Sequence, residues 1–464
     1  MDFINSNNPV INGNDELIEF LNNSVLYRKI YNNITSLIIY DCNEITIIPE
    51  GIFNFINLEE LKLCNFNALS SISDSICNLT NLTKLELHNC NALTSLPDSI
   101  CNLTNLKHLT INVCNAFHII PRNIDNLKNL NILELTTCDS LIELPESLGN
   151  LTNLTELYIF CDFLKQLPES ICNLNKLEQI ELITCNSLTS LPDSICDLTN
   201  LINITLYKCN SLISLPDNIG NIKTLDTFNI YNCSSLKSLP DSICNLSSLT
   251  SITIYMCSSL IRLPESICKL INLRDLIITC NDSLISLPVS IGLCSNIQKI
   301  KINHNNKILF GDIPASIILC INLKLLIYNN NIYYMDEMRE IWYPKIMSYN
   351  ENNNPNPFYT KPIIDAYSFI KWNYKTHNTH PINTQNTITT LLLIMQHIHI
   401  QKLDKPKPKP KPKHTPINAF VNTLLIEDLM SNIIYGNYDF ININKSIQEN
   451  TYNIHTKFVK NLTI

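Results

Sequence analysis

The sequence predicts an α/β solenoid in which about thirteen similar units stack and each adds one strand to a single parallel sheet. Three observations predict it: a repeat of 24 residues, apolar residues that alternate at the start of each copy, and a proline-containing segment that follows them. A period in this range is the signature of a repeat architecture, in which each unit packs against its neighbours.

The repeat continues without interruption through thirteen copies. One copy, residues 82–105, reads LTKLELHNCNALTSLPDSICNLTN. Equivalent residues are 24 apart in ten of the twelve steps, 23 apart from Leu157 to Ile180 and 26 apart from Ile300 to Leu326. The fourth residue of each copy, called the aligned residue below, is Leu37, Leu61, Leu85, Leu109, Leu133, Leu157, Ile180, Ile204, Phe228, Ile252, Leu276, Ile300 and Leu326.

The first part of each copy predicts a short strand. Leu85 and Leu87 alternate with Lys84, Glu86 and His88. A period of two fits a strand with one buried face and one face in water. Because every copy repeats this pattern, we expect thirteen parallel strands with stacked columns of side chains.

The second part of each copy predicts a return path with a short helix on the outer side. Pro97 cannot donate a ladder hydrogen bond, and Asp98 and Ser99 suit the first turn of a helix. The apolar residues of this part extend the core and are Leu93, Leu96, Ile100 and Leu103.

Cysteine or asparagine follows the strand in most copies. Backbone groups turn inward there and need a buried donor, which an amide supplies better than a thiol. This inner column comprises Cys42, Cys90, Cys114, Cys138, Cys185, Cys209, Cys233 and Cys257, then Asn281, Asn305 and Asn331. A second column, expected to be half-buried, follows the Ser-Ile pair: Cys77, Cys101, Cys172, Cys196, Cys244 and Cys268.

The cysteines favour free thiols in a cytoplasmic protein. All 19 lie between Cys42 and Cys320, none forms a CxxC pair, and residues 1–10 lack the apolar segment of a signal peptide. A disulfide ladder stays open as an alternative, because column neighbours lie at about the 5 Å that a disulfide tolerates. Zinc is disfavoured, because ligands in a line do not form a tetrahedron.

The pattern LxxLxLxxCxxLxxLPxSIxxLxx resembles the leucine-rich repeat, in the variety found in plant resistance proteins and Ras-group repeat proteins. The resemblance covers roughly residues 34–332. It implies a horseshoe whose concave sheet binds a protein. The abundant Asn and Ile, with only seven glycines, also resemble leucine-rich repeat proteins of giant amoeba viruses such as mimivirus, or of amoebae. For a viral protein the expected location is the host cytoplasm.

Both ends of the array are expected to carry caps, because an open solenoid end exposes core. In the N-terminal cap a helix is predicted at about Asp15–Asn22. The C-terminal region is expected to be mostly helical or partly disordered, and the chain to be a monomer. The predicted divisions are an N-terminal cap at 1–33, the array at 34–332, a C-terminal cap at 333–350, and a C-terminal region at 351–464 with an extended Lys-Pro linker at 405–413.

Charge and composition disfavour several functions. The net charge is −8; residues 1–331 carry 19 basic and 31 acidic side chains, and residues 332–464 carry 14 and 10. An acidic array is a poor partner for nucleic acid. No apolar stretch approaches the roughly 20 residues of a membrane span. No glycine-rich phosphate loop occurs.

No active site, cofactor or metal is predicted. No cysteine follows Cys320, so the C-terminal region cannot work through a cysteine thioester. His377 and His380, like His397 and His399, lack a carboxylate or cysteine that would complete a metal site.

The concave face is the predicted site for a protein partner. Tyr207, Tyr231 and Tyr255 form a ladder that serves either binding or cross-strand stacking, and both readings stay open. A partner lying along the face would meet acidic, then aromatic, then basic side chains. The candidate contacts are Glu86, Glu134, Tyr158, Phe160, Glu181, Tyr207, Tyr231, Tyr255, Lys299 and Lys301.

Two alternatives place a function in the C-terminal region. In one, the repeats select a substrate and residues 351–464 recruit cellular machinery such as a ubiquitin ligase. In the other, weaker one, this region is an enzyme of unknown type.

Overall fold

The computed structural model describes residues 8–26, 33–303, 317, 320, 322–328 and 330–335. These residues belong to one compact unit within residues 1–367. A single sheet of fifteen strands runs through it, with the strands in chain order. The strands are β1 (Val10–Asn12), β2 (Ser36–Tyr40), β3 (Glu60–Cys64), β4 (Lys84–His88), β5 (His108–Asn112), β6 (Ile132–Thr136), β7 (Glu156–Phe160), β8 (Gln179–Ile183), β9 (Asn203–Tyr207), β10 (Thr227–Tyr231), β11 (Ser251–Tyr255), β12 (Asp275–Thr279), β13 (Lys299–Asn303), β14 (Leu325–Tyr328) and β15 (Asn331–Tyr334).

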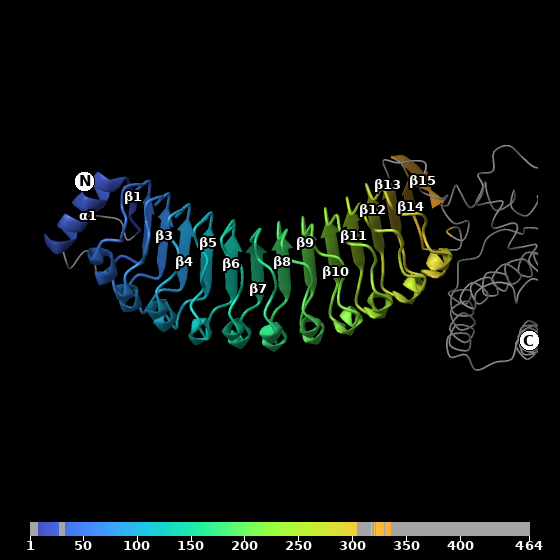
Figure 1. Ribbon diagram of the computed structural model, residues 1–464, viewed down its shortest axis with the longest axis horizontal. Coiled ribbons are helices and arrows are strands. Elements are labelled where there is room, and N and C mark those ends of the chain that lie inside the picture. The colour runs from blue at the N-terminus through green and yellow to red at the C-terminus, as the bar shows by residue number, and fades with distance from the viewer. Residues whose placement is uncertain are drawn as a thin grey trace, which may run out of the picture. The chain divides into compact units, whose positions relative to one another are not determined.

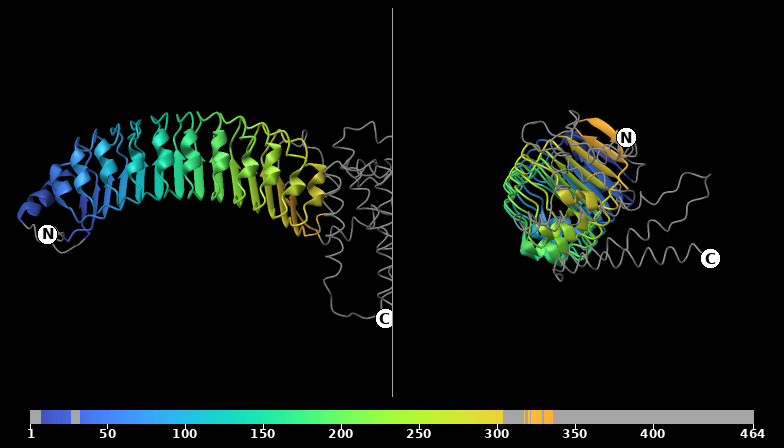
Figure 2. Two further views of the ribbon diagram at one scale, coloured as in Figure 1. Left: turned by 90° about the horizontal axis from the view of Figure 1, so that it is seen from below. Right: turned by 90° about the vertical axis from the view of Figure 1, so that its right-hand side faces the viewer.

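The thirteen predicted strands are β2 to β14, and each contains one aligned residue. Leu85 lies opposite Leu61 on one side and Leu109 on the other, in parallel pairing. The stack curves, with short helices along its convex side (Figure 1). Strands and helices keep to separate sides of the stack in the further views (Figure 2). The predicted α/β solenoid is therefore confirmed.

The outer helices are short 3-10 segments. In one repeat the extended Pro97 precedes the helix, and its carbonyl accepts from the backbone N–H of Ile100 at 3.1 Å. Ile100 then accepts from Leu103 at 3.0 Å. The segments are Glu50–Asn54, Asp74–Asn78, Asp98–Asn102, Ile124–Asn126, Glu146–Asn150, Glu169–Asn173, Asp193–Asp197, Ile219–Asn221, Asp241–Asn245, Ile267–Lys269 and Val289–Leu293.

The N-terminal cap contains the predicted helix, α1, which extends over Asn14–Leu26. Leu17 and Phe20 are buried, and the Phe20 ring lies 5.5 Å from that of Phe55. The cap also contains β1, which pairs in parallel with β2 and was not expected. Gly13 follows β1 with a φ of 88°, which glycine adopts without strain.

The array ends with a strand that reverses direction. β15 pairs antiparallel with β14, and Met335 beyond it is buried. β15 crosses the predicted boundary between array and cap at residues 332 and 333. The predicted cap beyond 335, the region 351–464 and the Lys-Pro linker lie outside the described residues, so these divisions stay predictions.

Each strand ends in a residue with positive φ, four places after the aligned residue. The backbone N–H of Val113, for example, donates to the carbonyl of Thr136 on the next strand at 2.8 Å. These turn residues are Asp41, Asn65, Asn89, Val113, Thr137, Thr184, Lys208, Asn232, Met256, Cys280 and Asn330. The repeat of β7 lacks this residue, because Cys161 follows Phe160 directly, and this deletion explains its 23-residue step.

The inner column works as expected. The Cys185 thiol donates to the carbonyls of Ile159 and Ile183, both at 3.5 Å. The Asn281 amide donates to Ile254 and Thr279 at 3.1 Å, and its oxygen accepts from the N–H of Cys257 at 2.7 Å. An amide thus makes three hydrogen bonds where a thiol makes two longer ones, as its extra donor and acceptor capacity permits.

The membership of the inner column needs correction. Cys161 belongs to it, because its thiol donates to the carbonyl of Leu135 at 3.5 Å. The deletion before Cys161 hid this position in the sequence. Asn331 was wrongly included, because it is the exposed first residue of β15. Asn305 lies outside the described residues.

The outer cysteine column is only in part half-buried. Cys77, Cys172 and Cys268 are partly exposed, whereas Cys101, Cys196 and Cys244 are buried. After each buried cysteine, the next repeat has an outer helix of three residues; after each partly exposed one, the next helix has five. Burial of these thiols therefore follows the neighbouring repeat. All 19 cysteines are free.

We predict that replacing Asn281 by Ala lowers the free energy of unfolding by about 3 kcal/mol, because buried partners of three hydrogen bonds lose them. The matched change Cys257→Ala should cost about half as much, because its thiol makes longer bonds at 3.6 and 3.8 Å. Urea denaturation of both variants measures the difference. Equal losses would show that the amide brings no advantage.

We also predict that Val113→Asn raises the free energy of unfolding by about 1 kcal/mol, because a β-branched residue is strained at a φ of 54° and Asn tolerates it. The same substitution at the exposed Ile119, whose φ is not positive, is the control and should not stabilise. Thermal denaturation compares the two. A Val113 variant no more stable than wild type would contradict the strain.

Candidate functional site: the concave face

The candidate site is the concave face, defined here by the side chains one place before, one place after and three places after each aligned residue. Parallel pairing keeps each set in a straight column, such as the one in which Tyr207, Tyr231 and Tyr255 lie opposite one another. Except for Glu181 and its neighbours around the deletion, the step along a column is 24 residues. Every predicted contact residue lies on this face, as expected from its position in the repeat.

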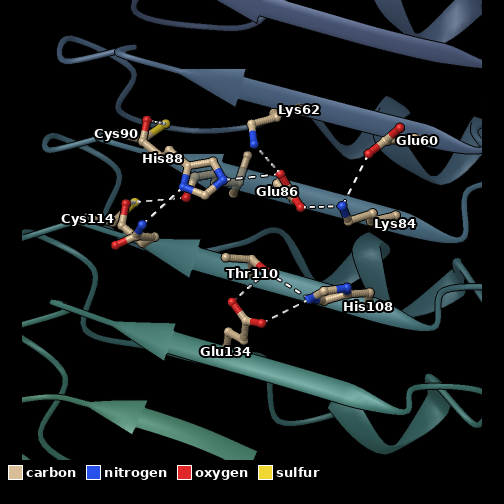
Figure 3. A network of polar contacts seen from close by, with 12 residues as sticks. Glu60, Lys62, Lys84, Glu86, His88, Cys90, His108, Thr110, Cys114 and Glu134 are labelled. Atoms are coloured by element: carbon tan, nitrogen blue, oxygen red, sulfur yellow. Dashed lines mark hydrogen bonds and ion pairs between the residues drawn. The ribbon is translucent and has the colours of Figure 1, made fainter. Parts of the chain in front are cut away.

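The face begins with a network of compensated charges on β3 to β5 (Figure 3). Glu86 forms ion pairs with Lys62 at 2.7 Å and with Lys84 at 2.5 Å, and His88 contacts the same carboxylate at 3.2 Å. The amide of Asn112 in turn lies 3.1 Å from Nδ1 of His88. The charges in this part of the face therefore neutralise one another.

Glu86 is only 8% exposed. Burial raises the pKa of its carboxyl, but the hydrogen bonds from Lys62, Lys84 and His88 outweigh burial and lower the pKa to about 2. The expectation of a free acidic charge at Glu86 was wrong, because both lysines come from columns that the sequence analysis did not consider together. Its role as a partner contact stays a prediction.

The next carboxylate, Glu134, has only polar partners. Its two oxygens lie 3.3 Å from Nε2 of His108 and 3.3 Å from the hydroxyl of Thr110 (Figure 3). Thr110 is buried and also lies 3.2 Å from the His108 ring. Glu134 therefore keeps its charge at the edge of the compensated network.

The centre of the face, on β6 to β8, carries three carboxylates around one tyrosine. The Tyr158 hydroxyl donates to Glu156 at 2.6 Å, and the Gln179 amide donates to Glu181 at 2.7 Å. Burial, this hydrogen bond and the charges of Glu156, Glu181 and Glu134 raise the pKa of Tyr158. In the described part of the chain, no Lys or Arg forms an ion pair with these three carboxylates.

Three tyrosines follow on β9 to β11. The rings of Tyr207 and Tyr231 lie 6.3 Å apart and are tilted by 55°, and Nζ of Lys208 lies 5.3 Å from the Tyr207 ring. Tyr255 is 37% exposed, and Met256 beside it is 44% exposed. Stacking is thus present for the first pair, while Tyr255 offers its ring to solvent.

The basic end of the face lies on β13. Lys299 stands opposite Asp275, and Lys301 stands opposite Ile277. Both lysines are half-buried, and neither is ion-paired with a carboxylate among the described residues. The order of acidic, aromatic and basic side chains along the face matches the expectation, except that the acidic part begins at Glu134.

Sequence reasoning missed two residues of the central repeat. Glu156 precedes an aligned residue, so the same period of two could have placed it on the face. Phe163 is 56% exposed and stands where the neighbouring repeats carry Ser140 and Ser187. The deletion before Cys161 obscured this comparison.

Other kinds of site were sought in the described part of the chain. Its residues bring no group of three His, Cys, Asp or Glu side chains together as metal ligands. None of its helices has the length and apolar character that a membrane crossing requires.

We predict that Glu86→Gln lowers the free energy of unfolding by about 2 kcal/mol at neutral pH, because Lys62 and Lys84 lose their shared counter-charge. The pKa of Glu86 is lower in the fold than its ordinary 4.5, so its stabilisation is complete above that value and disappears as the pH falls toward about 2. Urea denaturation across this pH range measures it. Glu169→Gln, an exposed change away from the face, is the control; a loss for Glu86→Gln that persists at the lowest pH would contradict the mechanism.

Comparisons with known proteins agree with the geometry. A family model described as a leucine-rich repeat region matches residues 37–166 and 162–328. No curated protein gives a match. Among solved structures, a leucine-rich repeat protein of Leptospira interrogans is 26% identical, with 68% of this chain and 84% of that chain covered and a TM-score of 0.48.

Two more solved structures are similar. The leucine-rich repeat domain of the type III effector XopL is 26% identical, with 48% of this chain and 76% of that chain covered and a TM-score of 0.42. An internalin of Listeria monocytogenes is 21% identical, with 60% and 75% covered and a TM-score of 0.43. The family model, which spans well over half of the chain, carries the assignment: the chain belongs to the leucine-rich repeat family.

Proposed function

We propose that the chain is a non-enzymatic scaffold that binds a protein partner across its concave face. Leucine-rich repeat domains are typically protein-interaction domains. The observation that carries the proposal is the tyrosine ladder of β9 to β11, where three large rings occupy one column and Tyr255 remains 37% exposed.

Tyrosine suits this role on physical grounds. Its ring supplies a large apolar contact at a small cost in side-chain entropy, and its hydroxyl offers a hydrogen bond at the rim. Contact between Tyr207 and Tyr231 orders two of the rings before a partner arrives. Less entropy is then lost on binding, because these side chains are already restricted.

We further propose a cytoplasmic location. The thiols of the inner column donate hydrogen bonds to buried carbonyls, as Cys138 does to Ile111 at 3.5 Å. Disulfide formation would remove these donors and leave the carbonyls unsatisfied. The column is therefore suited to a reducing compartment. The adaptor alternative concerns residues 351–464, which lie outside the described residues, and it stays a prediction.

We predict that changing Tyr207, Tyr231 and Tyr255 together to Ala abolishes partner capture by the full chain from an amoebal lysate. Loss of buried aromatic contacts at an interface centre costs about 2 kcal/mol or more per residue. Quantitative mass spectrometry compares the captured proteins with those of wild type.

The matched control changes three exposed apolar residues outside the concave columns, Ile56, Ile202 and Ile271, to Ala. Circular dichroism establishes that both variants are folded. If the tyrosine variant retains the same proteins as wild type and control, the ladder serves cross-strand stacking and the concave-face proposal is wrong.

A further inference from the structure

We propose that the centre of the concave face, on β6 to β8, takes a basic extended segment of the protein partner, with one lysine or arginine side chain over Tyr158. The inference rests on the proposed function and specifies the chemistry of the partner. It uses the sheet face formed by Glu134, Glu156, Tyr158, Phe160 and Glu181, called the central surface below.

The charges of the central surface are arranged around a single point. Tyr158 lies opposite Glu134 on one neighbouring strand and opposite Glu181 on the other. Because parallel strands are about 4.8 Å apart, the two flanking backbones are about 10 Å apart, with the tyrosine between them. Glu156 approaches the same ring from its own strand and accepts its hydroxyl hydrogen at 2.6 Å.

A cation placed over this ring would meet all three carboxylates. Two strands away, Glu86 shows what compensation looks like in this fold, with lysines at 2.7 and 2.5 Å. The carboxylates of the central surface have no such partner among the described residues. The charge complement is therefore left for a binding partner to supply, and the tyrosine ring adds a cation–π contact.

Aromatic side chains provide a second, independent argument for a peptide side of the partner. Phe160 follows Tyr158 on β7 and is half-buried. Phe163, just beyond the strand, is 56% exposed, where the adjacent repeats carry serine. An exposed phenylalanine that replaces a small polar residue adds apolar contact area that the fold itself does not use.

The same repeat lacks the turn residue that ends the neighbouring strands. Thr137 and Thr184 occupy that position on either side, with φ values of 54° and 51°. In the repeat of β7, Cys161 follows Phe160 directly, so no such side chain stands between the strand and Phe163. The central surface can thus continue from Tyr158 through Phe160 toward Phe163, which suits an extended segment with basic and apolar residues.

A metal ion does not fit this arrangement as well. Carboxylates flanking a tyrosine at about 10 Å cannot both reach one ion at the 2.0–2.6 Å of metal–oxygen bonds. A nucleic acid would bring negative charge to a negative surface. An organic cation on a flexible side chain can reach the ring centre, which favours a protein segment.

The test selects twelve-residue peptides from a random phage library against the folded full-length chain, then measures a labelled selected peptide by fluorescence anisotropy. Selected peptides should carry a lysine or arginine near an apolar residue. Changing Glu134, Glu156 and Glu181 together to Gln should weaken the peptide about tenfold or more. The control with the same change in net charge, Glu143→Gln, Glu169→Gln and Asp197→Asn at exposed positions off the face, should change affinity about twofold or less.

A second variant, Phe163→Ser, carries the residue of the adjacent repeats and so is expected to fold; it should also weaken the peptide. The proposal is overturned if no basic peptides are selected, or if both triple variants weaken binding equally, which would reveal only the net charge of the chain. Loss of capture in the Tyr207, Tyr231 and Tyr255 variant, with unchanged binding in the carboxylate variant, would leave concave-face binding standing and reject the basic partner.

Discussion

The structure depends on how each strand ends. Parallel strands leave backbone carbonyls pointing into the core at the same place in every repeat, and a buried carbonyl without a donor is costly. The thiol or amide of the following repeat supplies that donor, as Cys185 does for Ile159. A turn residue of positive φ then directs the chain away and donates to the next strand. These bonds join neighbours rather than residues within one repeat, so they fix the register of the whole sheet.

A fixed register frees the concave side chains from structural duties. Their positions are set by the columns, while their chemistry varies from strand to strand. The two halves of the acidic stretch show the difference: Glu86 is neutralised by Lys62 and Lys84 and contributes to stability, whereas Glu134 and Glu181 flank Tyr158 without a lysine or arginine. Charge on this face therefore has to be interpreted across strands, since a carboxylate's partner comes from the repeat next to it.

The repeat of β7 departs from the rules that the others follow. It lacks the turn residue, brings Cys161 directly after the strand and exposes Phe163 where small residues are usual. Departures from local consistency in an otherwise regular chain tend to mark functional positions. Here the departure coincides with the aromatic and acidic centre of the face, which is why this repeat, and not the regular ones, supports the most specific proposal.

The sequence alone determined the period, the thirteen parallel strands, the outer helices, the helix of the N-terminal cap and the columns that contain all the candidate contacts. It could do so because alternation and repeat length are local properties that stacking preserves. Tertiary structure decided which charges are compensated, because Glu86 meets lysines from two strands, and which outer cysteines are buried, because that follows the neighbouring helix. It also decided the two ends: β1 and β15 pair with the array through backbone hydrogen bonds, which carry no repeat signal for the sequence to show.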